Sequence, residues 1–203
     1  MQSKTKIQLS KFEQDLVMNA DWILTKNAIM EKMKVLLQEC LDLQIELLNT
    51  QKALLPSEIF HTSPKISKGE NYKGLPWLML DHPRHFNKES VFAIRTLFWW
   101  GRYFSITLHM SGHYKDLFAK KINRAFESLS AQRFYCCVSA NEWEHHFDED
   151  NYKLVDQCNE EEFQEIIDEK KFIKLSVRID LHEWEQLPLR TFEINKFLLE
   201  ILD

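Results

Sequence analysis

The first 55 residues contain neither glycine nor proline, so no residue that breaks helices occurs before Pro56. Ser10 with Glu13 three residues later forms a capping-box pattern, which predicts the start of a helix. The run Thr25-Lys26-Asn27 is a weaker helix former and predicts a break into two helices. A chain that opens this way is predicted to begin with long helices.

An apolar seam runs along the second of these predicted helices. Its steps alternate between four and three residues, as in a heptad repeat, through Ile29, Met33, Leu36, Cys40, Leu43 and Leu47. Leu37, Leu41 and Leu48 make the stripe broader than a strict coiled-coil seam. Two interpretations remain open, namely packing across the chain's own domain and a homodimer formed through the helix over 27–53.

The composition changes after this helical part. Residues 56–74 contain two prolines and two glycines and are predicted to form a loop between a helical arm, 1–55, and an α+β body, 75–203. Length and composition fit one compact domain overall.

Alternation of apolar and polar residues predicts strands in the body. It is clearest over 173–181 and 103–110, and shorter apolar runs predict further strands over 75–80, 91–100 and 133–139. A turn is expected over 81–86, and helices over 114–129, 160–171 and 188–202. The predicted fold class is α+β, a mainly antiparallel sheet of about five strands with helices on one face.

Several function classes are excluded by what the sequence lacks. The four glycines form no GxGxxG or GxxxxGK[ST] string, and no GxSxG or HExxH string occurs. The four cysteines form no CxxC pair and are predicted to be reduced, buried thiols of a cytosolic protein. No apolar signal region or membrane-length apolar run is found, so a cytoplasmic location is expected.

The polar sides of the predicted strands suggest a ligand site. Strand alternation places on one sheet face Arg95, Ser105, Thr107, His109, Tyr135, Cys137, Lys174, Ser176 and Arg178. An open face, or a cleft roofed by the amino-terminal helices, would bind a small anion through arginine forks, with Arg95, His109, Tyr135 and Arg178 as candidate ligand-binding residues. The alternative is a solvated sheet face without a ligand.

Histidines at predicted strand ends suggest a metal site. The candidate ligands are Asp81, His82, His85 and His109, and a second group of Glu142, Glu144, His145 and His146 follows another strand. No cofactor is predicted apart from such a divalent metal ion. The alternative is that these loop histidines are simply solvated.

The distribution of charged and aromatic residues indicates which partners the chain could bind. Residues 141–170 carry 12 acidic and 2 basic side chains, whereas residues 61–133 carry 12 basic and 5 acidic ones. Such asymmetry marks either a binding face or internal neutralisation. Trp100, Arg102 and Tyr103 could stack single-stranded nucleic acid, but a pI near 5.9 and the lack of a basic run disfavour it. No membrane partner is expected.

Residues 74–86, GLPWLMLDHPRHF, and 91–112, VFAIRTLFWWGRYFSITLHMSG, resemble conserved hypothetical proteins of Bacteroidetes-type bacteria. The resemblance implies a bacterial cytosolic protein and brings no activity, cofactor or catalytic residue. The function expected first is therefore non-enzymatic binding of a small anionic ligand or a protein partner. The alternatives are a metal-assisted enzyme that uses the His/Asp cluster at strand ends, and a single-strand nucleic-acid binder.

Overall fold

The computed structural model describes residues 7–51 and 54–203, and these residues contain one antiparallel sheet. Its strand order is β1-β2-β3-β4-β7-β5-β6. The strands are β1 (Lys65–Tyr72), β2 (Leu75–Phe86), β3 (Val91–Trp99), β4 (Tyr103–Ser111), β5 (Tyr135–Cys137), β6 (Tyr152–Leu154) and β7 (Phe172–Ile179). The α+β class and the antiparallel sheet are confirmed, with seven strands instead of about five.

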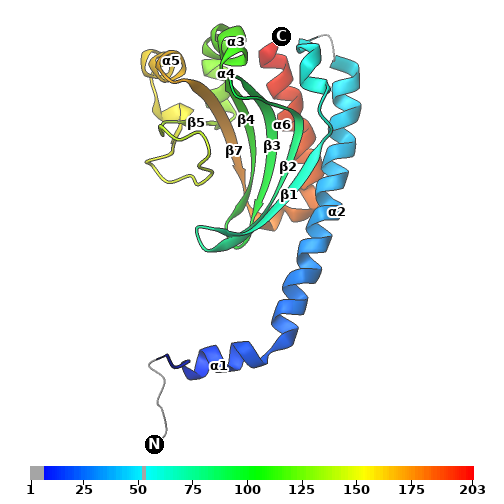
Figure 1. Ribbon diagram of the computed structural model, residues 1–203. Helices are drawn as coiled ribbons and strands as arrows, with labels where there is room; N and C mark the ends of the chain where they lie inside the picture. Colours follow the sequence, from blue (N-terminus) through cyan, green and yellow to red (C-terminus); the bar gives the residue numbers. More distant parts are fainter. Residues whose placement is uncertain (1–6, 52–53) are drawn as a thin grey trace, which may run out of the picture.

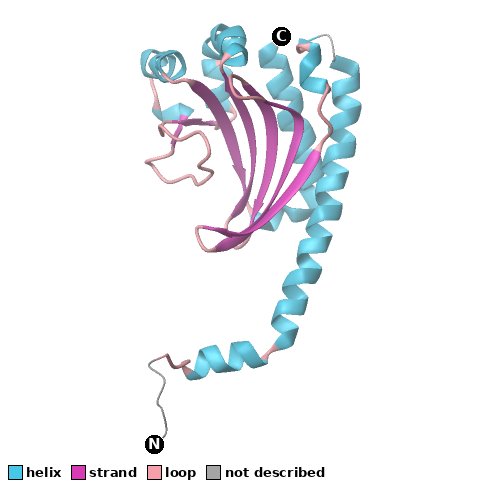
Figure 2. Cartoon of the chain, viewed as in Figure 1, coloured by secondary structure: helices cyan, strands magenta, loops and turns pink. Residues whose placement is uncertain are grey.

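The helices lie mainly behind and above this sheet, as Figures 1 and 2 show. They are α1 (Lys11–Met18), α2 (Ala20–Gln51), α3 (His113–Arg124), α4 (Phe126–Ala131), α5 (Glu160–Glu169) and α6 (Leu187–Leu202), with short 3-10 turns η2 (Ser57–Phe60), η3 (Val155–Gln157) and η4 (Leu181–Gln186). None of the described helices is long and apolar enough to cross a bilayer. Because α2 and α6 cover the same sheet face, that face must be apolar.

Strand alternation supplies this apolar face. On β4, Phe104, Ile106 and Leu108 point toward the helices and are fully buried. The matching positions of β7, Val177 and Leu175, pair with Ile106 and Leu108. Residues directly opposite each other in antiparallel strands point to the same side, so these rows form one continuous core with the helices.

The amino-terminal helices form as predicted, apart from the position of the break. Ser10 and Glu13 make the capping box of α1. The chain leaves the helix at Asn19 and not at residues 25–27, and the Asn19 side chain then accepts a hydrogen bond from Trp22 N of α2. Residues 1–6 and 52–53 of the predicted helical span lie outside the described residues. In Figure 1, α1 projects from the body at an angle to α2.

The apolar seam of α2 is buried within its own chain. Met33, Leu36, Cys40 and Leu47 belong to the main core, which also contains residues of α6 and of the sheet. Thr191 of α6 lies directly against Cys40. The seam that suggested a homodimer through residues 27–53 is therefore already occupied by the chain's own core.

Two expected loops are strands. Residues 65–72 form the edge strand β1, and residues 81–86, expected as a turn, continue β2. β1 is mostly polar because its sheet edge is exposed, which hides it from a search for apolar runs. Gly69 is needed there, since a Cβ atom would lie 2.4 Å from the indole ring of Trp77.

Candidate functional site

The polar sides of the strands share one face, as alternation predicts. In one row Arg95, Thr107, Ser176 and Tyr135 are direct neighbours across four strands. In the next row His109 pairs with Lys174. The predicted residues are thus brought onto one face, which we call the covered face because it is not open to solvent.

Burial corrects the expectation of an open or solvated face. His109 and Ser176 are 0% exposed and Lys174 is 2% exposed. The amino-terminal helices do not form the roof, since they pack on the opposite face. The cover is the segment 138–151, which joins β5 to β6 and contacts Tyr72, Tyr103 and Lys174 of the sheet. In Figure 1 its loop lies beside β7.

Polar contacts hold this cover segment onto the sheet. The Tyr72 hydroxyl donates to a Glu144 carboxylate oxygen at 2.8 Å and accepts from His145 N at 2.7 Å. The Tyr103 hydroxyl donates to the His145 carbonyl at 3.3 Å. The Lys174 ammonium donates to the Glu144 carbonyl. Burial lowers the pKa of Lys174 to about 8, because desolvation penalises its charged form.

At one end of the covered face, Glu142 and Trp143 close over a buried histidine. His109 Nε2–H donates to the Glu142 carboxylate at 2.7 Å, and the Trp143 ring lies 5.3 Å from the His109 ring. Burial lowers the pKa of His109 to about 4, although the bond to Glu142 opposes this shift. The same bond lowers the pKa of Glu142, so the pair is a neutral imidazole that donates to a carboxylate.

Arg95 lies beside this pair and is itself neutralised. Its Nε donates to Asp81 Oδ1 at 2.7 Å, and both side chains are almost fully buried. The guanidinium also lies 5.9 Å from the Trp143 ring. Nη1 of Arg95 and Nδ1 of His109 make no hydrogen bond with the described residues.

Two grooves of about 620 and 520 Å³ flank Trp143. The larger one has charged side chains of both signs in equal number: Lys88, Lys115, Lys170, Lys171, Glu89, Asp116, Glu142 and Glu169. Two of these lysines already donate hydrogen bonds to backbone carbonyls, Lys115 to that of Asp168 and Lys170 to that of Val138. This end therefore has no net preference for an anion.

The opposite end, at the strand turns, has a different charge balance. A groove of about 340 Å³, the turn groove, is lined by Lys73, Trp99, Gly101, Arg102, Tyr103, Phe147, Asp148 and Arg178. Three cations thus face one carboxylate. Lys73 and Gly101 have positive φ angles of 48° and 66°, so the tight turns of two hairpins place the groove residues.

The two arginines of the turn groove rest on aromatic rings. The Arg102 guanidinium lies 5.5 Å from the Trp99 ring, and that of Arg178 lies 6.0 Å from the Tyr103 ring. Within residues 7–51 and 54–203, neither guanidinium has a carboxylate within 4.0 Å. Lys73 lies 3.4 Å from Asp148. Stacking on the aromatic rings holds the two guanidinium groups in place and leaves their N–H groups free to bind a ligand.

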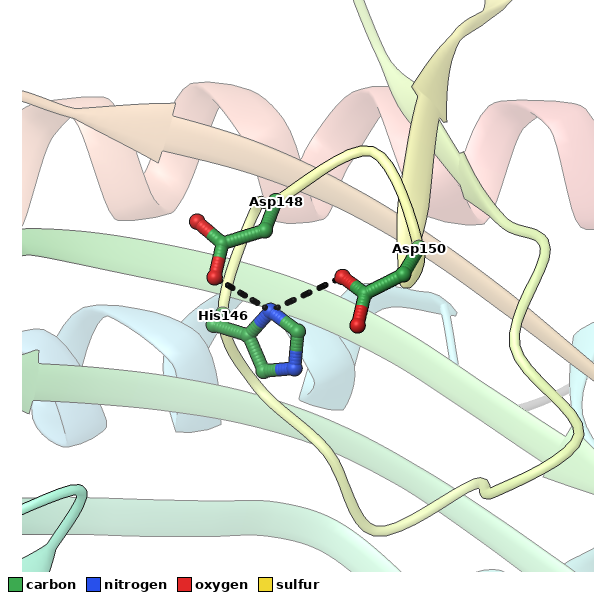
Figure 3. A group of neighbouring side chains, drawn as sticks. All are labelled: His146, Asp148 and Asp150. Carbon is green, nitrogen blue, oxygen red and sulfur yellow. Dashed lines mark ion pairs between the residues drawn. The ribbon is translucent and has the colours of Figure 1, made fainter.

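Next to this groove, the cover segment carries a cluster of a histidine and two carboxylates, shown in Figure 3. His146 Nδ1 lies 3.1 Å from Asp148 Oδ2 and 3.7 Å from Asp150 Oδ1. Among the described residues, this is the one group of three or more potential metal ligands whose ligand atoms lie within 4.8 Å of one another.

The predicted ligand-binding residues are split between the two ends. Arg95 and His109 lie under Trp143, whereas Arg178 lines the turn groove. Tyr135 packs between them, with its ring 4.7 Å from that of Phe147. One predicted set thus contributes to two separate environments.

The predicted metal set is not brought together. Asp81 and His109 lie on the covered face, where each pairs with another residue. The pairing of β2 with β3 shifts between Asp81 and Arg84, so His85 lies opposite Phe92 on the helix side, where it bonds Tyr114. His82 lies at the shift, and its carbonyl accepts from Gln44 of α2. The irregularity in β2 therefore turns His85 away from the face that holds Asp81 and His109.

The predicted nucleic-acid trio is also divided. Arg102 and Tyr103 line the turn groove, whereas Trp100 packs on the helix side, 6.3 Å from the Trp22 ring. Trp99 takes its place in the groove. Sequence reasoning missed Lys73 because β1 was not predicted, although the Lys73-Gly74 pair is a turn signal.

In comparison with known proteins, the chain matches no protein-family model, no curated protein and no solved structure.

Proposed function

We propose that this chain is a binding protein for a small organic anion, a carboxylate or a phosphate monoester, which it takes up in the turn groove. The observation that carries the proposal is the pair of guanidinium groups, Arg102 and Arg178, that face the groove without a carboxylate partner among the described residues. Two free arginine forks attract a bidentate anion, because their planar N–H pairs match its oxygens.

The walls of the groove favour an anion with a flat apolar part. Trp99, Tyr103 and Phe147 line it together with the cations. Aromatic walls bind flat apolar groups, while the charged rim fixes the orientation of the anionic end. A volume of about 340 Å³ admits a small molecule rather than a polymer chain.

Location belongs to the same proposal. All four cysteines are buried and unpaired, which fits a reducing compartment such as the cytosol. A cytosolic binding protein would meet phosphate esters and carboxylates as common metabolites.

The first test is a titration of the untagged protein with phenyl phosphate, in which binding is measured by calorimetry and by tryptophan fluorescence. We expect saturable binding that weakens about tenfold or more in the variants Arg178→Gln and Arg102→Gln, because each loses one charge-assisted contact. The matched control is Arg124→Gln, an exposed arginine of α3 outside the turn groove, which should change the affinity by less than about twofold.

Two results would overturn this proposal. One is equal loss of binding in Arg124→Gln and Arg178→Gln, since that would indicate general charge attraction. The other is tighter binding of a mixed single-stranded oligonucleotide than of phenyl phosphate, which would favour a nucleic-acid site. Inorganic phosphate, tested in parallel, shows how much of the affinity comes from the aromatic walls.

A further inference from the structure

The cluster next to the turn groove contains a histidine that is buried but makes no hydrogen bond through Nδ1. His146 is 5% exposed, and its Nδ1 points toward Asp148 and Asp150 in Figure 3. A buried ring nitrogen without a hydrogen bond is costly, so a native protein usually gives it a partner. A cation held between the nitrogen and the carboxylates would satisfy it.

We propose that His146, Asp148 and Asp150 bind a divalent transition-metal ion, with Zn²⁺ as the representative ion. The ligand set combines one imidazole nitrogen with two carboxylate oxygens, which suits Zn²⁺ better than the all-oxygen ions Mg²⁺ and Ca²⁺. This site does not depend on the anion proposed for the turn groove.

The distances between the ligand atoms fit such an ion. Bonds of about 2.1 Å to zinc place adjacent ligand atoms about 3.0–3.4 Å apart. Nδ1 of His146 lies 3.1 Å from Asp148 Oδ2 and 3.7 Å from Asp150 Oδ1. Both distances lie near that range, and all three ligand atoms lie within 4.8 Å of one another.

The backbone explains how residues two apart meet at one point. Asp148 O accepts hydrogen bonds from Asn151 N at 2.9 Å and Tyr152 N at 3.0 Å, which closes a turn. The Asn151 side chain donates to the His146 carbonyl from inside that turn. The turn thus holds the chain on both sides of His146, Asp148 and Asp150.

A third carboxylate, Glu144, stands on the far side of the imidazole, as is common in metal sites. Glu144 Oε2 lies 3.6 Å from His146 Nε2 and is held by the Tyr72 hydroxyl. A metal-bound histidine usually has its other N–H directed at a carboxylate, which fixes the ring orientation and raises its basicity. Glu144 is positioned for that role without being a ligand itself.

The test is calorimetric titration of the untagged, chelator-treated full chain with Zn²⁺, repeated with Mg²⁺, together with the absorption spectrum of the Co²⁺-loaded protein. We expect about one Zn²⁺ per chain, much weaker binding of Mg²⁺, and Co²⁺ bands in the visible range. Asp150→Asn should weaken Zn²⁺ binding about tenfold or more, and because Asp150 is exposed this variant should fold normally.

The matched control is Glu149→Gln, which removes an equal charge from the same turn at a position outside the cluster. It should change Zn²⁺ affinity by less than about twofold. Equal weakening in both variants would overturn the proposal, because it would indicate attraction by the acidic loop as a whole. Absence of Zn²⁺ binding, or Zn²⁺ and Mg²⁺ binding with equal affinity, would overturn it as well.

The turn groove and this site share Asp148, but each also contains a residue that the other lacks, so they can be tested separately. Arg178→Gln should leave Zn²⁺ binding unchanged, whereas Asp150→Asn removes a proposed metal ligand that does not line the groove. A wild-type protein that binds Zn²⁺ but not phenyl phosphate would reject the proposed function alone, and a wild-type protein that binds phenyl phosphate but not Zn²⁺ would reject the metal site alone.

Discussion

At the Glu142 end of the covered face every buried charge faces a partner, whereas at the turn end two guanidinium groups face a groove. Arg95 pairs with Asp81, and His109 pairs with Glu142. The side chains of the three sheet residues, Arg95, Asp81 and His109, are at most 12% exposed. Arg102 and Arg178 are exposed and rest on aromatic rings. Removing one partner of a buried ion pair destabilises the fold, whereas a solvated cation without an ion-pair partner is free to bind a ligand. We therefore propose a structural role for Arg95 and a binding role for Arg102 and Arg178.

The largest expected effect comes from breaking the buried pair. Asp81→Asn leaves the Arg95 guanidinium almost fully buried without its counter-ion, which should cost about 3–5 kcal/mol of the free energy of unfolding. Urea denaturation, monitored by tryptophan fluorescence, measures this loss.

The matched control at the other end is Asp148→Asn, whose side chain is 72% exposed and which should cost less than about 1 kcal/mol. A double variant, Asp81→Asn with Arg95→Met, should recover part of the loss, because no unpaired charge is then buried. Equal costs for Asp81→Asn and Asp148→Asn would remove the distinction between the two ends.

A smaller effect is expected from acidification. His109 is neutral in the fold, with a pKa of about 4 against 6.5 for a free imidazole, so below pH 6.5 the unfolded chain binds more protons than the folded chain. Stability should therefore fall as the pH drops from about 6.5 toward 4. Between pH 7 and pH 5 this histidine alone accounts for about 2 kcal/mol.

Denaturation at both pH values measures this slope. His82, whose pKa burial also lowers to about 4, adds a loss of the same sign. The titratable groups that act on or with His109 are Glu142, Lys174, Arg95 and His145. Glu142 adds to the loss only at lower pH, since its own pKa is lowered. His109→Gln should reduce the pH dependence, with the remainder coming from His82 and from His145, whose pKa burial also lowers. His182→Gln, on the exposed η4 turn, should leave the pH dependence unchanged. A slope unaffected by His109→Gln would contradict the buried neutral imidazole.

The fold was predictable where side-chain alternation is regular. Residues 103–110 and 173–181 alternate cleanly, so both the core face and the membership of the covered face followed from the sequence. Alternation says which residues share a face, but not what covers it. Segment 138–151 has no periodic pattern, and it covers the sheet through contacts such as Tyr72 with Glu144, far apart in the chain.

The candidate sites were predictable only in part, for the same reason. Arg178 was named as a ligand-binding residue and lines the turn groove, while Lys73 was missed with its strand. The metal ligands expected at 81–85 were divided by a register shift that no local pattern announces. His146 was noted among the histidines after a strand, but its approach to Asp148 and Asp150 depends on a turn closed by backbone hydrogen bonds.

The smallest expected effect is the stability change on removing a turn-groove cation. Arg178→Gln eliminates a guanidinium that is exposed, lacks an ion pair among the described residues and lies 6.0 Å from the Tyr103 ring. Its free energy of unfolding should stay within about 0.5 kcal/mol of the wild-type value, since exposed cations contribute little. Denaturation in urea at low and moderate salt measures it, with Arg124→Gln as the exposed control. A loss as large as that of Asp81→Asn would mean that Arg178 supports the cover segment, and the groove would then belong to the structural end of the comparison. A near-zero change together with weakened phenyl phosphate binding would separate binding from stability at this one side chain.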